Sequence, residues 1–173
     1  MSDTIQKITW PKSILKDMIN GRLSSEEIRE IQRQAKDPDI FAKMIEIEQD
    51  RVSWKDKIIA PLQEHLYIVQ KGDERLVKCS CGYEFGDYKQ NWKLNSLVYE
   101  RKPEDGEVYV GPRAFDGNWV IMREFYCPGC GTQLEVELLP HGHPFIFDAE
   151  IDIDGFYAQH PDLRERVFGK KDI

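Results

Sequence analysis

KCSCGYEF, from Lys78 to Phe85, is the stretch on which the fold of this 173-residue chain depends. It holds Cys79 and Cys81 with one serine between them, and the remaining two cysteines, Cys127 and Cys130, stand in CPGCG. Two such tight pairs can form disulfides, a redox centre or a metal site. Each choice implies a different structure, so the rest of the sequence has to decide among them.

The spacing and surroundings of the cysteines favour a structural zinc site. Zinc takes four thiolates at the corners of a tetrahedron, with Zn–S distances of about 2.3 Å, and two turns can each supply two of them. A glycine, Gly82 or Gly131, follows each pair and permits a tight turn whose N–H groups face the sulfur atoms. Lys78 is placed to offset part of the thiolate charge. The pattern therefore predicts a zinc-ribbon-like site with four ligands: Cys79, Cys81, Cys127 and Cys130.

Three other uses of these cysteines remain open from the residues alone. Cysteine is often buried as a free thiol, although single buried cysteines seldom occur as two glycine-flanked pairs. A redox C-x-x-C usually opens a helix, whereas the residues after Gly131 alternate like a strand. A rubredoxin-type iron site uses the same four thiolates, so ligand type does not separate iron from zinc. Four cysteine ligands leave no open coordination position, so a metal here is expected to be structural.

The composition is that of an acidic folded protein. Apolar residues make up 40% and charged residues 32%, with a formal net charge of −7. Such acidity argues against a protein that coats a phosphate backbone, so we expect no nucleic-acid partner. No run of 18 apolar residues and no signal-peptide pattern occurs, so we expect no membrane span and a cytoplasmic location, where thiols stay reduced.

The first third of the chain has helical periodicity. Ser24 and Glu27 form a capping box for one helix, and Asp37-Pro38 precedes another that is expected from Ile40 to Val52. The helix before them, which Gly21 is placed to end, has an apolar face formed by Ile14, Leu15, Met18 and Ile19.

The pattern becomes strand-like after Pro61. LYIVQ (66–70) and RLVKC (75–79) flank KGDE as a hairpin, while NWVIMREFYC (118–127) and QLEVELL (133–139) lead into and out of the second cysteine pair. The turn-rich segments 100–107 and 111–118 are expected to be loops. FIFDAEID (145–152) alternates like a further strand, and a short helix is expected near Phe156.

These elements predict an α+β fold: N-terminal helices plus a small antiparallel, zinc-ribbon-like β domain. We expect a helical N-terminal region over residues 1–60 and a zinc-binding β region over residues 61–157. Residues 158–173 are expected to form a C-terminal tail.

Two segments imitate functional sites. EIDIDGFY resembles the start of an EF-hand loop, but Pro161 occupies the twelfth position, where a glutamate is required. As a strand, residues 147–154 would carry an acidic face, either solvated or used to dock a basic partner, formed by Asp148, Glu150, Asp152 and Asp154. His141 and His143 are interpreted as loop residues and His65 as a packed histidine. Because no nucleophile elbow, phosphate loop or kinase motif occurs, we expect no catalytic or cofactor-binding residues here.

From about residue 36 to residue 157 the chain resembles the small γ subunit of ATP-dependent acetone carboxylases. The most specific segment is CSCGYEFGDYKQNWKL (79–94), because plain zinc ribbons lack its continuation after the cysteines. The other matching segments are KDPDIFAKMIEIEQDRVSWKDKIIAPL (36–62), LYIVQ (66–70), VIMREFYCPGCGT (120–132), with Met122 as an insertion, and IDGFY (153–157).

The resemblance implies a component of a larger enzyme. In that family, a heterohexamer of two large α, two large β and two γ chains converts acetone, bicarbonate and ATP to acetoacetate. The ATP and manganese chemistry is assigned to the large subunits, and the γ chain is a non-catalytic zinc subunit. Related acetophenone carboxylases also carry a small zinc subunit, so the resemblance does not decide which ketone is the substrate. The alternative from another class is a free-standing zinc-ribbon module for protein interaction.

Overall fold

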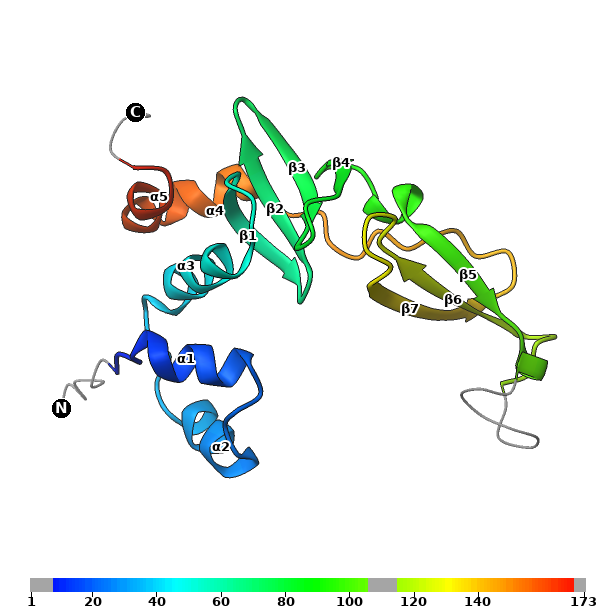
Figure 1. Ribbon diagram of the computed structural model, residues 1–173, viewed down its shortest axis with the longest axis horizontal. Helices are drawn as coiled ribbons and strands as arrows, with labels where there is room; N and C mark the ends of the chain where they lie inside the picture. Colours follow the sequence, from blue (N-terminus) through cyan, green and yellow to red (C-terminus); the bar gives the residue numbers. More distant parts are fainter. Residues whose placement is uncertain (1–7, 106–114, 170–173) are drawn as a thin grey trace. The chain divides into compact units, whose positions relative to one another are not determined.

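The computed structural model describes residues 8–105 and 115–169, which belong to two compact units (Figure 1). A helical unit combines the residues up to Arg51 with those from Ile153 onward, and a β unit spans Val52–Asp152. Helices at both ends and two antiparallel sheets between them confirm the predicted α+β class.

The three N-terminal helices form where the sequence places them. The predicted capping box is present before the second one, because the Ser24 hydroxyl accepts from the Glu27 backbone N–H at 3.3 Å and the Glu27 carboxylate accepts from the Ser24 N–H at 2.7 Å. Gly21 follows the first helix with φ of 64°. The helices are α1 (Lys12–Ile19), α2 (Ser25–Arg33) and α3 (Ile40–Arg51).

Two short C-terminal helices, α4 (Ile153–Gln159) and α5 (Pro161–Phe168), complete the helical unit. The Phe156 ring in α4 lies 5.1 Å from the Phe41 ring in α3, between centroids. Arg166 in α5 donates to the Glu46 carboxylate of α3 at 2.8 Å. The last described residues therefore pack on the N-terminal helices. None of the helices in the described ranges is long and apolar enough to cross a membrane.

The first sheet of the β unit, sheet A, is an antiparallel meander of four strands in chain order. Its strands β2 and β3 are the hairpin predicted from LYIVQ and RLVKC. Pro61 lies in β1, which is an edge strand, where a residue without an N–H is tolerated. The strands are β1 (Lys57–Gln63), β2 (Leu66–Lys71), β3 (Glu74–Cys79) and β4 (Glu84–Asp87).

The second sheet, sheet B, consists of β5 (Leu97–Arg101), β6 (Val120–Tyr126) and β7 (Gln133–Pro140), with β6 in the centre. Two 3₁₀ turns, η1 (Trp92–Asn95) and η2 (Pro103–Asp105), flank β5. The strands β6 and β7 confirm the prediction from the residues around the second cysteine pair.

A chain of aromatic rings runs through the core of the β unit from β4 to sheet B. Neighbouring centroids lie 5.0 to 6.2 Å apart, and adjacent rings meet edge to face, an arrangement that stabilises beyond the area buried. The members are Tyr83, Phe85, Trp92, Phe125 and Phe145. Trp92 comes from the NWKL segment, so this segment supplies a ring to the core of the β unit.

The two units divide the chain differently from the ranges expected from sequence. The β unit begins at Val52 rather than residue 61, because β1 lies in a segment expected to be helical. Within the expected C-terminal tail, α5 forms and its Arg166 binds Glu46 of α3. Segment 100–107 also contains strand residues, Glu100 and Arg101 of β5, while residues 106–114 lie outside the described ranges.

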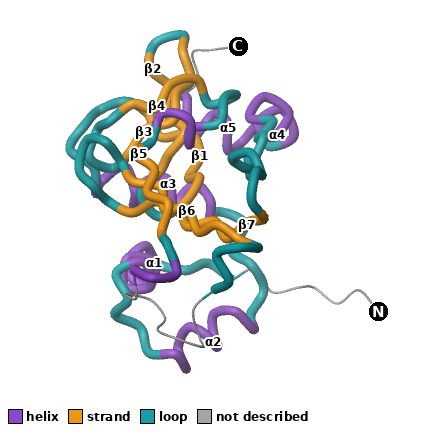
Figure 2. Tube along the Cα trace, turned by 90° about the vertical axis from the view of Figure 1, so that its right-hand side faces the viewer, coloured by secondary structure: helices purple, strands orange, loops and turns teal. Residues whose placement is uncertain are grey.

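The strand predicted over residues 147–154 is absent. Figure 2 draws the segment between β7 and α4 as loop, and Ile153 and Asp154 belong to α4. The expected acidic face therefore does not form, and Asp148 instead accepts a hydrogen bond from Lys93. Alternation alone predicted a strand here, but neither sheet pairs with this segment.

Candidate metal centre

The first cysteine pair lies in the turn between β3 and β4. Cys79 ends β3, and its N–H donates to the Tyr83 carbonyl at 2.8 Å, while the Gly82 N–H donates back to the Cys79 carbonyl at 2.8 Å. Gly82 has φ of 103°, a conformation that residues with a side chain rarely adopt. The turn places Cys79 inside the unit and Cys81 at its surface.

The second pair lies in the turn between β6 and β7 and repeats this arrangement. The Cys127 N–H donates to the Thr132 carbonyl at 2.9 Å, and the Gly131 N–H donates to the Cys127 carbonyl at 2.8 Å. Gly131 has φ of 71°. Cys127 is buried and Cys130 is exposed, so each turn supplies one inner and one outer sulfur.

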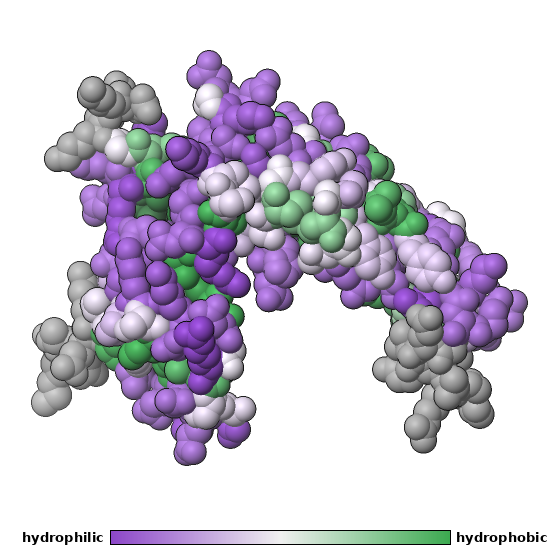
Figure 3. All heavy atoms as spheres, viewed as in Figure 1, coloured by the Kyte–Doolittle hydropathy of each residue, from purple (hydrophilic) through white to green (hydrophobic). Residues whose placement is uncertain are grey.

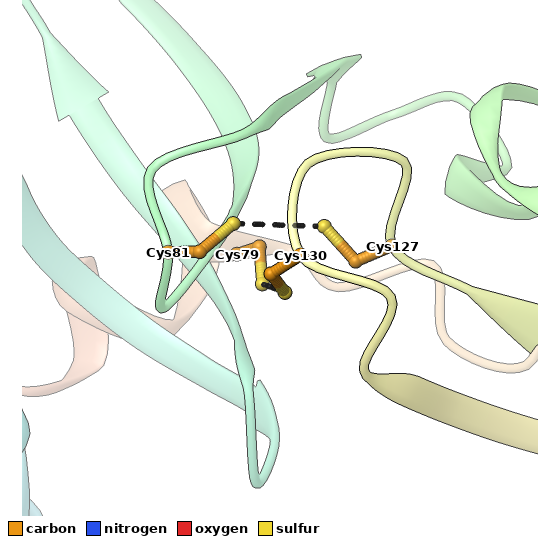
Figure 4. A group of neighbouring side chains, drawn as sticks. All are labelled: Cys79, Cys81, Cys127 and Cys130. Atoms are coloured by element: carbon orange, nitrogen blue, oxygen red, sulfur yellow. Dashed lines mark hydrogen bonds between the residues drawn. The ribbon is translucent and has the colours of Figure 1, made fainter.

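The two turns face each other and bring the four sulfur atoms together (Figure 4). The Sγ atoms of Cys79 and Cys130 are 3.9 Å apart, and those of Cys81 and Cys127 are 3.7 Å apart. All four Sγ atoms lie within 4.8 Å of one another. A tetrahedron with Zn–S bonds of about 2.3 Å has S–S edges of about 3.8 Å, so this four-cysteine cluster fits a tetrahedral metal.

Backbone dipoles support negative charge on these sulfur atoms. Burial raises the pKa of Cys127, but hydrogen bonds from the N–H groups of Gly129 and Cys130 favour its thiolate. Burial likewise raises the pKa of Cys79, and the Cys81 N–H opposes that effect. The hydroxyl of Thr132 lowers the pKa of Cys130 to about 7. A cation that replaces the thiol protons compensates the charge that burial otherwise disfavours.

Residues around the cluster hold the turns in place. The Trp54 indole N–H donates to the carbonyls of Cys79 and Ser80, at 3.2 and 3.1 Å. A Cβ atom at Gly129 would lie 2.9 Å from Cβ of Tyr83 and 3.2 Å from the sulfur of Cys81, so only glycine fits between the turns.

Lys78 does not offset the thiolate charge as expected from its position next to Cys79. Its ammonium group donates to Asp56 at 2.6 Å and to Glu84 at 3.1 Å. Strand alternation explains the difference, because successive side chains point to opposite faces of β3. Lys78 therefore stabilises sheet A rather than the cluster.

Three histidines that the sequence singled out do not belong to the four-cysteine cluster. His141 and His143 are exposed and hydrogen-bond to backbone carbonyls, those of Gly117 and Pro144 respectively. His65 is half-buried, and its ring nitrogen lies 3.4 Å from the Ser80 hydroxyl.

Sequence reasoning missed a second polar cluster in the β unit. The Lys93 side chain is fully buried, and its ammonium donates to Glu135 and Glu137 of β7, each at 2.7 Å, and to Asp148. It also lies 5.3 Å from the centroid of the Phe125 ring. Although burial opposes its charge, the three carboxylates raise the pKa of Lys93, so it remains an ammonium ion. The Lys93 cluster (Lys93, Glu135, Glu137 and Asp148) connects η1, β7 and the segment after β7.

Comparison with known proteins gives consistent matches. The model of a family described as acetone carboxylase gamma subunit matches residues 52–161, which include both clusters. An acetone carboxylase gamma subunit of Xanthobacter autotrophicus is 36% identical over 156 residues, covering 88% of this chain and 93% of the relative. An acetophenone carboxylase beta subunit of Aromatoleum aromaticum is 42% identical over 104 residues, covering 58% of this chain and 78% of the relative.

Proposed function

This chain belongs to the acetone carboxylase gamma subunit family, and from that premise we propose that it is a non-catalytic, zinc-binding subunit of a ketone carboxylase complex. The family explains why the chain has partner subunits. The zinc, its structural role and the absence of catalysis are the new parts of the proposal.

The observation that carries the zinc proposal is the tetrahedral spacing of four sulfur atoms from two different hairpins. One turn belongs to sheet A and the other to sheet B, so an ion bound there ties the sheets of the β unit together. Zinc bound to four cysteines is closed to substrate and contributes its binding energy to folding. Cys79, Cys81, Cys127 and Cys130 would thus hold the shape of the subunit.

The non-catalytic role is supported by the carboxylates that surround the buried Lys93. In the Lys93 cluster, which is the second group of converging acidic side chains in the described β unit, the ammonium is already bound by three carboxylates. A catalytic lysine needs an ammonium that can lose its proton near neutral pH, whereas these carboxylates raise the pKa of Lys93. Following the family resemblance, we assign ATP and manganese binding to the large α and β subunits of a cytoplasmic ligase with two copies of each chain.

The ketone is a separate choice between two candidates. The matched relative that covers most of this chain is named for acetone, whereas the relative with higher identity over a shorter segment is named for acetophenone. We propose acetone, because the match to this chain covers 93% of the acetone carboxylase subunit but only 78% of the acetophenone carboxylase subunit.

Co-expression tests the proposal. The large α and β chains of the same organism are produced with and without this chain, and ATP- and bicarbonate-dependent loss of acetone and of acetophenone is measured. We expect carboxylation of acetone to require all three chains and zinc to be present at one equivalent of this chain. A fully active and assembled pair of large chains without this one would contradict a required role. A chain that never co-purifies with them would instead favour the free-standing module.

A further inference from the structure

Strand β7 has its polarity inverted with respect to the interior of the β unit. Glu135 and Glu137 point inward to Lys93, whereas the intervening Val136 and the following Leu138 point outward and are 47% and 53% exposed. Antiparallel sheets usually bury the apolar residues and solvate the charged ones. The inversion leaves two large apolar side chains exposed on the outward side of β7.

The outward residues of the neighbouring strands continue this apolar surface across sheet B. Residues that pair directly across an antiparallel ladder share a face, which places Tyr99 and Glu124 beside Val136, and Arg101 and Met122 beside Leu138. Leu97 of β5 follows on the same face and is 57% exposed. We call this surface the outer sheet face, and define it by Leu97, Tyr99, Arg101, Met122, Glu124, Tyr126, Val136 and Leu138.

The charges on the outer sheet face neutralise each other. Arg101 donates to both carboxylate oxygens of Glu124, at 2.8 and 3.0 Å, and the Tyr126 hydroxyl donates to the same carboxylate at 2.7 Å. Glu124 is buried beneath its neighbours. The face thus carries no net charge, although the whole chain has a formal charge of −7. Interface cores are depleted in unpaired charge in the same way.

A further exposed hydrophobic residue precedes this sheet in the chain. Leu94 in η1 is 68% exposed, and Figure 3 shows hydrophobic side chains at the surface where Figure 1 draws η1 and the start of β5. The largest exposed apolar patch of a protein is often a functional surface.

We propose that the outer sheet face is the surface through which this chain docks on an uncharged, apolar patch of a large subunit of the carboxylase. This inference rests on the proposed function, because the partner is a chain of that complex. Three strands about 4.8 Å apart and about 20 Å long present roughly 300 Å². Two copies joined only through this face would bury far less than the roughly 800 Å² per partner of a stable interface, whereas a larger chain can reach the surface around it.

The test uses the complete chain co-expressed with the large α and β chains, with a tag on this chain. Val136→Arg combined with Leu138→Arg places two charges on exposed positions, so the variant should fold and keep its metal. We expect it to retain the large chains at least about 10-fold more weakly than wild type, as for charges introduced into an interface core. Leu138→Met, which keeps the surface apolar, and Gln90→Arg, which adds a charge at an exposed turn position, should bind as wild type.

Each outcome separates this proposal from the proposed function. If wild type and the arginine variant retain the large chains equally, the docking surface is wrong while the subunit assignment stands. If wild type does not retain them, both are wrong. If the isolated wild-type chain is a dimer by light scattering and the arginine variant a monomer, the face joins two copies of this chain and the large subunit is not its occupant.

Discussion

The four-cysteine cluster and the Lys93 cluster are both sites in the β unit where acidic groups converge, but they differ in where the compensating charge comes from. Three carboxylates surround an ammonium that the chain itself supplies. Four cysteine sulfurs lie together while the nearby Lys78 is engaged elsewhere, and in our proposal a bound zinc ion supplies the compensating charge. Under the zinc proposal, one cluster makes the fold depend on metal supply, while the other is complete as soon as the chain folds.

The largest expected effect comes from Cys127→Ser, which removes one buried ligand. Structural zinc contributes about 10 kcal/mol or more of apparent binding free energy to folding, so losing it should unfold the β unit. We expect bound zinc to fall well below one per chain and the near-ultraviolet circular dichroism of the aromatic core to disappear. Gln90→Ala, at an exposed turn position of the same unit, is the control and should keep both signals. A Cys127→Ser chain with a wild-type spectrum would show that the two clusters do not differ in this way.

A smaller effect is expected when the internal cation is removed by Lys93→Met. The substitution leaves three carboxylates without their counter-ion, and an unpaired buried charge costs about 3–5 kcal/mol. Protonation relieves the repulsion, so the variant should gain stability as the pH falls, as measured by urea unfolding at several pH values. Zinc should remain bound near neutral pH. The control is Lys89→Met, an exposed lysine, which should change little, and a Lys93→Met chain as stable as wild type would contradict the account.

Gly129→Ala probes the closeness of the two cysteine turns. The new methyl group would collide with Tyr83 and Cys81, and overpacking of this kind costs about 1–3 kcal/mol. The turns would have to separate, so we also expect faster loss of zinc to a chelator. Gly131→Ala strains only its own backbone, because no atom lies within 4 Å of its added Cβ. Equal rates of zinc loss from the two variants would argue against steric contact between the turns.

The smallest effect concerns Glu135. Burial, aided by the charges of Asp148 and Glu137, raises the pKa of Glu135 above its ordinary value of 4.5, although Lys93 opposes the shift. Between pH 4.5 and the raised pKa, the folded state therefore binds more protons than the unfolded state. The contribution of Glu135 to the free energy of unfolding decreases as the pH rises from 4.5 through the folded-state pKa. Glu135→Gln should flatten that decrease in denaturant titrations, while Glu74→Gln at an exposed site should leave it unchanged. An unaltered slope in Glu135→Gln would contradict an excess of negative charge around Lys93.

The two clusters also differ in how visible they are in the sequence. Cysteine spacing and the following glycines pointed to Cys79, Cys81, Cys127 and Cys130, and the structure brings these four together. Lys93 lies 42 to 55 residues from the carboxylates it binds, and nothing in a single sequence links them. The alternation in QLEVELL predicted β7 correctly but could not show that its glutamates face inward. The segment 145–152 has the same alternation without a strand to pair with, which is why that prediction was wrong.

The most direct test of the central claim is X-ray absorption at the zinc edge of the purified chain, combined with metal analysis. The four-cysteine cluster predicts one zinc per chain with four sulfur neighbours at about 2.3 Å and no nitrogen or oxygen neighbours. Absence of zinc, iron in its place, or a mixed shell with an oxygen ligand would contradict a closed structural zinc site.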